Sequence, residues 1–187
     1  ALLKGVEPRT TQDPELRNAV AISYDLMGQP AAAERVLAVG PQDVQTYGMR
    51  ASLLAKQKDD PGLLALYTDI SRQATKPDPA QRLLLGKIAE YLKRYEEAVN
   101  WYHSVPGGPE RDESRLRAAN AQNELGRTDK ALAEVHAIQS DATVDDDARR
   151  DAYLLEAELR QRVQFTGIVV AALALVALAL ATGRVGA

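Results

Sequence analysis

The two histidines and a short acidic run are the residues of this sequence that most readily suggest chemistry. Histidine and carboxylate side chains bind metal ions or transfer protons where several of them converge. Neither His103 nor His136 has a second histidine or a carboxylate four residues further along the chain. The run 145–147 is Asp-Asp-Asp, which lacks the alternating spacing and the central glycine of a calcium-binding loop. We therefore predict no metal site and no catalytic residue.

Other reactive motifs are missing as well. The chain contains no cysteine, which excludes disulfides and thiolate metal sites. No serine lies in a nucleophile elbow, and the Gly-Gly pair at 107–108 stands between two prolines, which indicates a turn rather than a phosphate-binding loop. The sequence therefore predicts a protein that is not an enzyme and that carries no cofactor.

Charge gives no sign of a nucleic-acid partner. The 187 residues include 23 basic and 26 acidic side chains, for a net charge of −3. A nucleic-acid-binding protein usually carries a basic patch or stripe. Here basic and acidic residues alternate along segments rich in alanine, leucine, glutamate and arginine, which favour helices. We predict an all-α protein whose charges lie on solvated helix faces.

A pattern of six positions recurs along the chain at offsets of 0, 3, 7, 12, 16 and 19 residues. Its copies begin at Ala21, Ala51, Gly86, Ala119 and, incompletely, Ala157. The mean spacing of these starts is about 34 residues, a period typical of helix–turn–helix repeats. Aspartates just before a proline, at 13, 60 and 78, indicate capped helix starts. Each copy is therefore predicted to be a pair of helices that stacks on its neighbours.

Three segments carry a resemblance to a known family: AISYDLMGQPAAAERVL, LGKIAEYLKRYEEAVNWY and AANAQNELGRTDKALAEV. They resemble the tetratricopeptide-repeat (TPR) family in its bacterial type and, more weakly, TPR proteins of bacterial cell envelopes. The resemblance implies an α-solenoid of antiparallel helix pairs in a right-handed superhelix. The uncharged segment after it predicts an additional hydrophobic C-terminal helix. The expected boundaries are 1–13 for the end of a preceding repeat, 14–162 for the array, 163–183 for the hydrophobic helix and 184–187 for a tail.

The same resemblance implies a function and a site. TPR arrays are scaffolds or adaptors without enzymatic activity, and their first helices line a concave groove that holds a peptide or helix of a partner protein. Carried onto this sequence, the family's groove positions are Asn18, Ile22, Asp25, Ser52, Lys56, Leu83, Lys87, Glu90, Tyr91, Asn120 and Asn123.

The hydrophobic segment 163–183 contains 21 residues without a charge. As a helix it would be about 31 Å long, close to the thickness of a bilayer core. It predicts a transmembrane anchor, so that the protein would be an adaptor tethered to a membrane. Arg149, Arg150, Arg160 and Arg162 precede the segment and only Arg184 follows it. This asymmetry favours a cytoplasmic repeat domain.

A second interpretation stays open. The chain could be a soluble piece of a larger periplasmic or cell-envelope TPR scaffold, a lipoprotein-type adaptor for a protease or an assembly factor. The fifth repeat would then have its first helix at 148–162, and the hydrophobic segment would occupy the place of the second helix without being an anchor.

Overall fold

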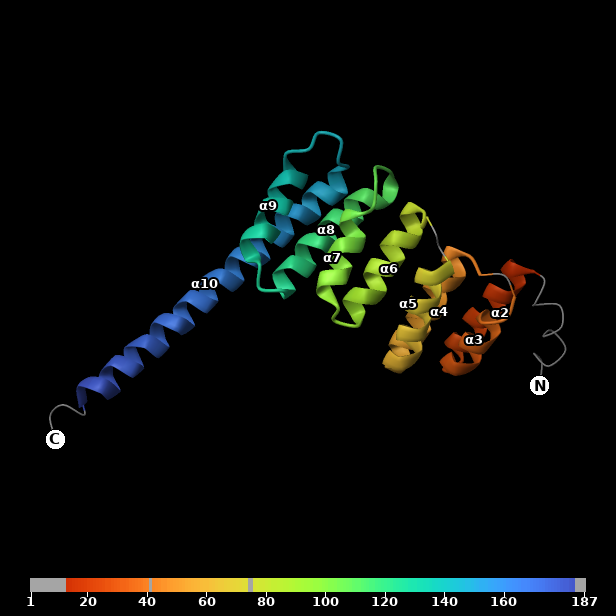
Figure 1. Cartoon of the computed structure of the whole chain (residues 1–187), viewed down its shortest axis with the longest axis horizontal. Coiled ribbons are helices and arrows are strands. Elements are labelled where there is room, and N and C mark those ends of the chain that lie inside the picture. Colours follow the sequence, from red (N-terminus) through yellow and green to blue (C-terminus); the bar gives the residue numbers. More distant parts are fainter. Residues whose placement is uncertain (1–12, 41, 74–75, 184–187) are drawn as a thin grey trace. The chain divides into compact units, whose positions relative to one another are not determined.

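The computed structural model describes residues 13–40, 42–73 and 76–183, without the side chains of 176 and 179–183. Within these ranges the secondary structure is helical and contains no strand, which confirms the predicted all-α class (Figure 1). The helices are α2 (Pro14–Leu26), α3 (Pro30–Leu37), α4 (Val44–Gln57), α5 (Asp60–Gln73), α6 (Pro79–Tyr91), α7 (Tyr95–His103), α8 (Pro109–Glu124), α9 (Thr128–Gln139) and α10 (Asp146–Gly183).

The chain divides into two compact units, with the boundary between Arg111 and Asp112. Helices α2 to α7 belong to the first unit, and α9 and α10 belong to the second. Helix α8 begins just before the boundary. In the first unit, α2 packs on α3, α4 on α5 and α6 on α7, and α3 contacts α4 while α5 contacts α6. The first unit is thus a succession of helix pairs.

Aspartate side chains cap several helix starts. Asp13 accepts hydrogen bonds from the backbone N–H groups of Glu15 and Leu16 at 3.0 and 3.2 Å. Asp78 forms a full capping box with Gln81. The predicted cap at position 60 is wrong by one residue, because Asp59 accepts the bond from the N–H of Gly62. A capping side chain needs an extended backbone before the first helical residue, and α5 already begins at Asp60.

Four turns between paired helices have the same backbone structure. The residue at the third position of the sequence repeat has a left-handed conformation in each turn, and these residues are Gly28, Lys58, Lys93 and Gly126, with φ between 56 and 73°. In every case its N–H donates to the carbonyl three residues earlier, and the next N–H donates to the carbonyl five residues earlier, at 2.8 to 3.0 Å. This bonding satisfies carbonyls at the end of the first helix. The repeat found in the sequence therefore recurs in the backbone.

The fourth position of the repeat lies where the second helix of a pair packs inward. Its residues are Ala33, Leu63, Ala98 and Ala131, and none is more than 1% exposed. Close packing is also seen between α6 and α7, where a Cβ atom at Gly86, the first position of its repeat, would overlap the ring of Tyr102. Tyr102 is itself buried, and its hydroxyl donates to the carboxylate of Glu90. Small residues at these positions allow the helices to pack closely.

A polar cluster joins α5 to α7. The indole N–H of Trp101 donates to the hydroxyl of Tyr67 at 2.8 Å, and that hydroxyl donates to the carboxylate of Glu97 at 2.9 Å. The guanidinium of Arg94 lies 5.3 Å from the centre of the Tyr67 ring. Burial raises the pKa of Tyr67 above its ordinary value. The cluster holds the hydroxyl protonated and fixes the two helices against each other.

In the second unit, α8, α9 and α10 share one core. It contains Ala119, Ala131, Val135, Ile138, Val144, Ala148, Ala152, Leu155 and Leu159. Beside it, the carboxylate of Glu156 accepts hydrogen bonds from Gln139 at 2.8 Å, His136 at 3.1 Å and Arg160 at 2.8 Å. These bonds, that of Gln139 first, lower the pKa of Glu156 to about 2.

Helix α10 differs from the prediction. Positions 148–162 and the hydrophobic segment were expected to be two elements, but they form one continuous helix of 38 residues. A helix ends where a glycine, a proline or a capping residue interrupts it. Residues 160–166 include no glycine and no proline, so the first helix of the fifth repeat continues into the hydrophobic segment. Figure 1 shows α10 extending beyond the end of α9.

The predicted transmembrane span is wrong. In the part of the chain that the structure describes, no helix has the length and apolar character needed to cross a membrane. The apolar segment instead continues directly from the charged first half of α10, which ends with Arg160 and Arg162. The localisation at a membrane with a cytoplasmic repeat domain depended on that span and is withdrawn.

Two other predictions lie outside the described residues. The end of a preceding repeat was placed at 1–13, of which only Asp13 is described, as the cap of α2. The tail at 184–187 is not described.

Candidate functional site

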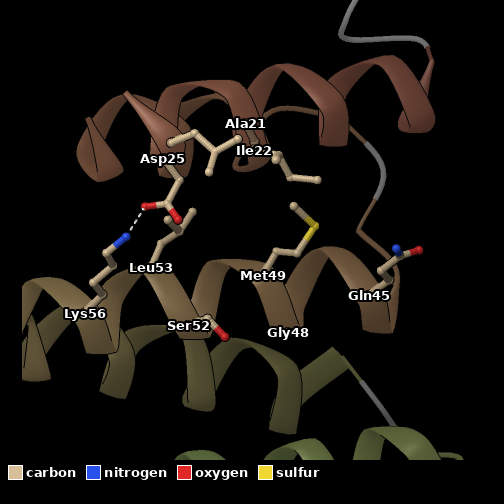
Figure 2. A pocket seen from close by; sticks show the side chains of 10 residues that line it. Ala21, Ile22, Asp25, Gln45, Gly48, Met49, Ser52, Leu53 and Lys56 are labelled. Carbon is tan, nitrogen blue, oxygen red and sulfur yellow. Dashed lines mark hydrogen bonds and ion pairs between the residues drawn. The ribbon is translucent and has the colours of Figure 1, made fainter. Parts of the chain in front are cut away.

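A hollow lies between α2 and α4 in the first unit. It encloses about 440 Å³ and is lined by Ala21, Ile22, Asp25, Leu26, Gln45, Gly48, Met49, Ser52, Leu53 and Lys56. Figure 2 shows the side chains of the two helices facing each other across it. Its walls are mainly aliphatic, and Ile22 is 49% exposed. An exposed aliphatic wall favours an apolar ligand.

A second hollow lies between α4 and α6. It encloses about 350 Å³ and is lined by Gly48, Ala51, Ser52, Ala55, Leu63, Leu84, Lys87, Ile88 and Tyr91. Tyr91 stands at its edge, where its hydroxyl donates to the carbonyl of Ala55 on α4 at 2.7 Å. This bond fixes an exposed aromatic ring against the hollow. Tyrosine held in this way offers a large contact surface at little entropic cost.

The two hollows meet on α4, because Gly48 and Ser52 line both of them. We call the joint feature the α2–α4–α6 groove. A Cβ atom at Gly48 would meet no other atom within 4 Å. Gly48 and Ser52 form the ridge that separates the hollows. Because Gly48 has no side chain, the ridge is low, and a ligand backbone can approach α4 closely there.

Charged groups lie at the edge of the groove. The ammonium of Lys56 is 2.7 Å from the carboxylate of Asp25, and the two side chains are 57% and 33% exposed (Figure 2). The pair bridges α4 and α2 at one end of the first hollow. An ion pair so exposed contributes about 0 to 1 kcal/mol, and a charged ligand can therefore separate it at little cost.

Six of the predicted groove residues line the groove in the structure: Ile22, Asp25, Ser52, Lys56, Lys87 and Tyr91. The others do not line it. Leu83 is only 7% exposed and belongs to the interior. Asn18 is half-buried, and Glu90 accepts the hydrogen bond from Tyr102.

The remaining two predicted residues are on α8, beyond the boundary of the first unit. Asn120 is exposed, and Asn123 accepts a hydrogen bond from Thr128 at 3.2 Å. Neither residue lines the α2–α4–α6 groove.

The predicted set omitted much of the aliphatic lining. Leu26, Met49, Leu53 and Ile88 were not among the predicted residues because their types are equally typical of a core. Gly48 could have been found, because a glycine in the interior of a predicted helix lowers helix stability and often marks a close approach.

The groove has the composition of a binding surface. It offers aliphatic walls, one fixed aromatic ring and a few charged groups at its edge. In the described part of the chain, no group of three or more histidine, cysteine, aspartate or glutamate side chains is arranged to hold a metal ion.

Comparison of the chain with protein-family models, with curated proteins and with solved structures finds no match.

Proposed function

We propose that this protein is a protein–protein interaction scaffold without enzymatic activity, and that its α2–α4–α6 groove binds a peptide or a helix of a partner protein. The observation that carries the proposal is the pair of adjoining aliphatic hollows on either side of α4, which share Gly48 and Ser52. Grooves of this kind hold segments whose apolar side chains enter successive pockets.

We further propose that the array is of the TPR type. Support comes from the four turns with one hydrogen-bond pattern, which lie at the same position of a repeat of about 34 residues. Support also comes from the buried fourth position, which is small in three of the four copies. In such arrays one hairpin cannot bury its own apolar face and depends on its neighbours.

Selection from a random peptide library displayed on phage tests the proposal. We expect selected peptides to bind the wild-type chain and to bind Gly48→Arg at least about tenfold more weakly, because the arginine side chain would occupy the ridge that both hollows share. A Cβ atom at this position meets no atom, so the substitution should leave the helix intact.

A matched variant completes the design. Ala65→Arg places an arginine on the exposed face of α5, away from the groove, and should retain binding. Peptides that bind all three chains equally well would show that the groove is not the binding surface.

A further inference from the structure

The second half of α10 exposes an apolar surface to solvent. We call residues 163–178 the apolar tail. Its described side chains are all exposed, and Phe165, Ile168 and Leu175 are each 67 or 68% exposed. Monomeric proteins rarely expose apolar patches larger than a few hundred Å². Burial of this tail against an apolar surface is therefore strongly favoured in water.

The spacing of side chains on the tail is specific. Ile168 and Leu175 are seven residues apart, which places them on one face of the helix about 10.5 Å from each other. Between them on that face lie Ala171 and Ala172. The tail thus presents two large aliphatic side chains with a shallow region between them.

The α2–α4–α6 groove has the complementary form. Its two hollows lie on opposite sides of α4, so their centres are separated by about one helix diameter, or roughly 10 Å. Gly48 and Ser52 line both hollows and form the ridge between them. An extended strand fits less well, because residues about 10 Å apart on a strand are three positions apart and point to opposite faces.

We propose that the apolar tail of one copy of this chain docks in the α2–α4–α6 groove of a second copy. Ile168 and Leu175 enter the two hollows, and Ala171 and Ala172 lie against the ridge at Gly48. The inference rests on the proposed function, since it requires the groove to accept a helix. The tail carries no charge, so the ion pair at the edge of the groove stays intact.

The interface is heterologous, because a tail meets a groove. In a pair joined by one such contact, one copy keeps a free groove and the other keeps a free tail. Further chains can therefore add head to tail. This head-to-tail assembly differs from a symmetric dimer in which two tails pair with each other.

Sedimentation velocity of the full chain over a wide concentration range is the first test. We expect the wild-type mass to rise above that of one chain as the concentration increases. Leu175→Asp should weaken association at least about thirtyfold, the effect of losing one buried aliphatic side chain. Gly48→Arg fills the ridge between the hollows and should weaken association by at least as much. Ile168→Asp is a second tail variant with the same expected result.

Two variants serve as matched controls. Ala65→Arg adds the same arginine side chain to the exposed face of α5, away from the groove, and Leu154→Asp changes a leucine of α10 that is 63% exposed but precedes the tail. Both should associate like the wild type. Circular dichroism of every variant checks that the helices are retained.

Mixing the two defective variants is the decisive experiment. Gly48→Arg keeps an intact tail, and Leu175→Asp keeps an intact groove, so an equimolar mixture should form complexes of two chains and no larger species. A wild-type chain that stays monomeric at every concentration overturns the inference. So does a Gly48→Arg chain that associates like the wild type, which would indicate pairing of tails, or a mixture that remains monomeric.

These results are distinguishable from failure of the proposed function. If the wild-type chain is monomeric but selected peptides bind it and not Gly48→Arg, the tail inference is wrong and the groove is still a binding site. If Gly48→Arg changes neither the binding of selected peptides nor the association of the chains, the groove has no binding function.

Discussion

Two glycines in the first unit have opposite surroundings. Gly86 on α6 faces the buried contact with α7, where the ring of Tyr102 fills the space of a side chain. Gly48 on α4 faces the groove, where a Cβ atom would meet nothing within 4 Å. Both residues lie in the interiors of helices, and glycine weakens a helix in either case. At Gly86 this weakness is compensated by close packing, whereas no described atom packs against the position of a side chain at Gly48.

The comparison separates residues that maintain the fold from residues that are open to a ligand. A glycine needed for packing resists substitution, whereas a glycine that faces the groove tolerates it. The change in the free energy of unfolding on substitution therefore distinguishes a helix face that packs in the interior from one that faces the groove. The following substitutions test this distinction, from the largest expected effect to the smallest.

Gly86→Val should lower the free energy of unfolding of the first unit by about 3 kcal/mol, because the new side chain must displace the buried ring of Tyr102. Urea unfolding followed by circular dichroism measures the change. Replacing Tyr102 by leucine in the same chain removes the ring and should restore part of the loss. If Gly86→Val alone is neutral, the two helices are not as closely packed as the structure has them.

The left-handed turns extend the comparison to the backbone. Lys93 has a φ of 58° and Gly126 a φ of 73°, a conformation that costs a residue with a side chain about 1 kcal/mol. Lys93→Gly should therefore raise the free energy of unfolding by up to about 1 kcal/mol, and Gly126→Ala should lower it by about the same amount. Opposite signs in urea titrations are the expected result, and equal signs would contradict the shared turn structure.

Gly48→Ala should raise the free energy of unfolding by roughly 0.5 to 1 kcal/mol, since alanine has the higher helix propensity and the added methyl group meets no atom. A loss of stability would mean that the ridge packs against something in the folded chain.

Acidification tests a contact that depends on charge rather than on packing. The pKa of Glu156 is about 2, below its ordinary value of 4.5, mainly through the hydrogen bond from Gln139. A carboxyl group with a lowered pKa contributes stability above its ordinary pKa, and this contribution is lost as the pH falls toward the lowered value. The melting temperature of the second unit should therefore fall between pH 4.5 and about 2. Glu156→Gln, which cannot titrate, should show a smaller decrease.

The repeat was predictable because it depends on local sequence. The spacing places the third repeat position at Lys58 and Lys93, where the sequence has no glycine, and the structure has a left-handed turn at each. The cap at Asp59 was missed because the neighbouring Asp60 precedes a proline and carries the same local signal. Asp59 precedes the first helical residue and can cap α5, whereas Asp60 is already helical.

The errors concern residues whose surroundings are set by distant parts of the chain. Leu83 is of a type that suits a groove or a core, and only packing places it inside. The continuation of α10 past Arg162 was missed because the boundary was set by composition, at the start of the uncharged segment, and a change of composition does not end a helix. The aliphatic lining of the groove was missed for the same reason as Leu83.

Trp101 gives the first unit an optical signal of its own. It is the only tryptophan of the chain, and its indole is bonded to Tyr67 within that unit. The sequence after Arg111 contains one tyrosine, Tyr153, and no tryptophan. Tryptophan fluorescence, excited at a wavelength that tyrosine hardly absorbs, therefore reports the separation of α5 and α7. Far-UV circular dichroism reports the helices of both units. Whether the two curves coincide will tell how cooperatively the units unfold, without any label.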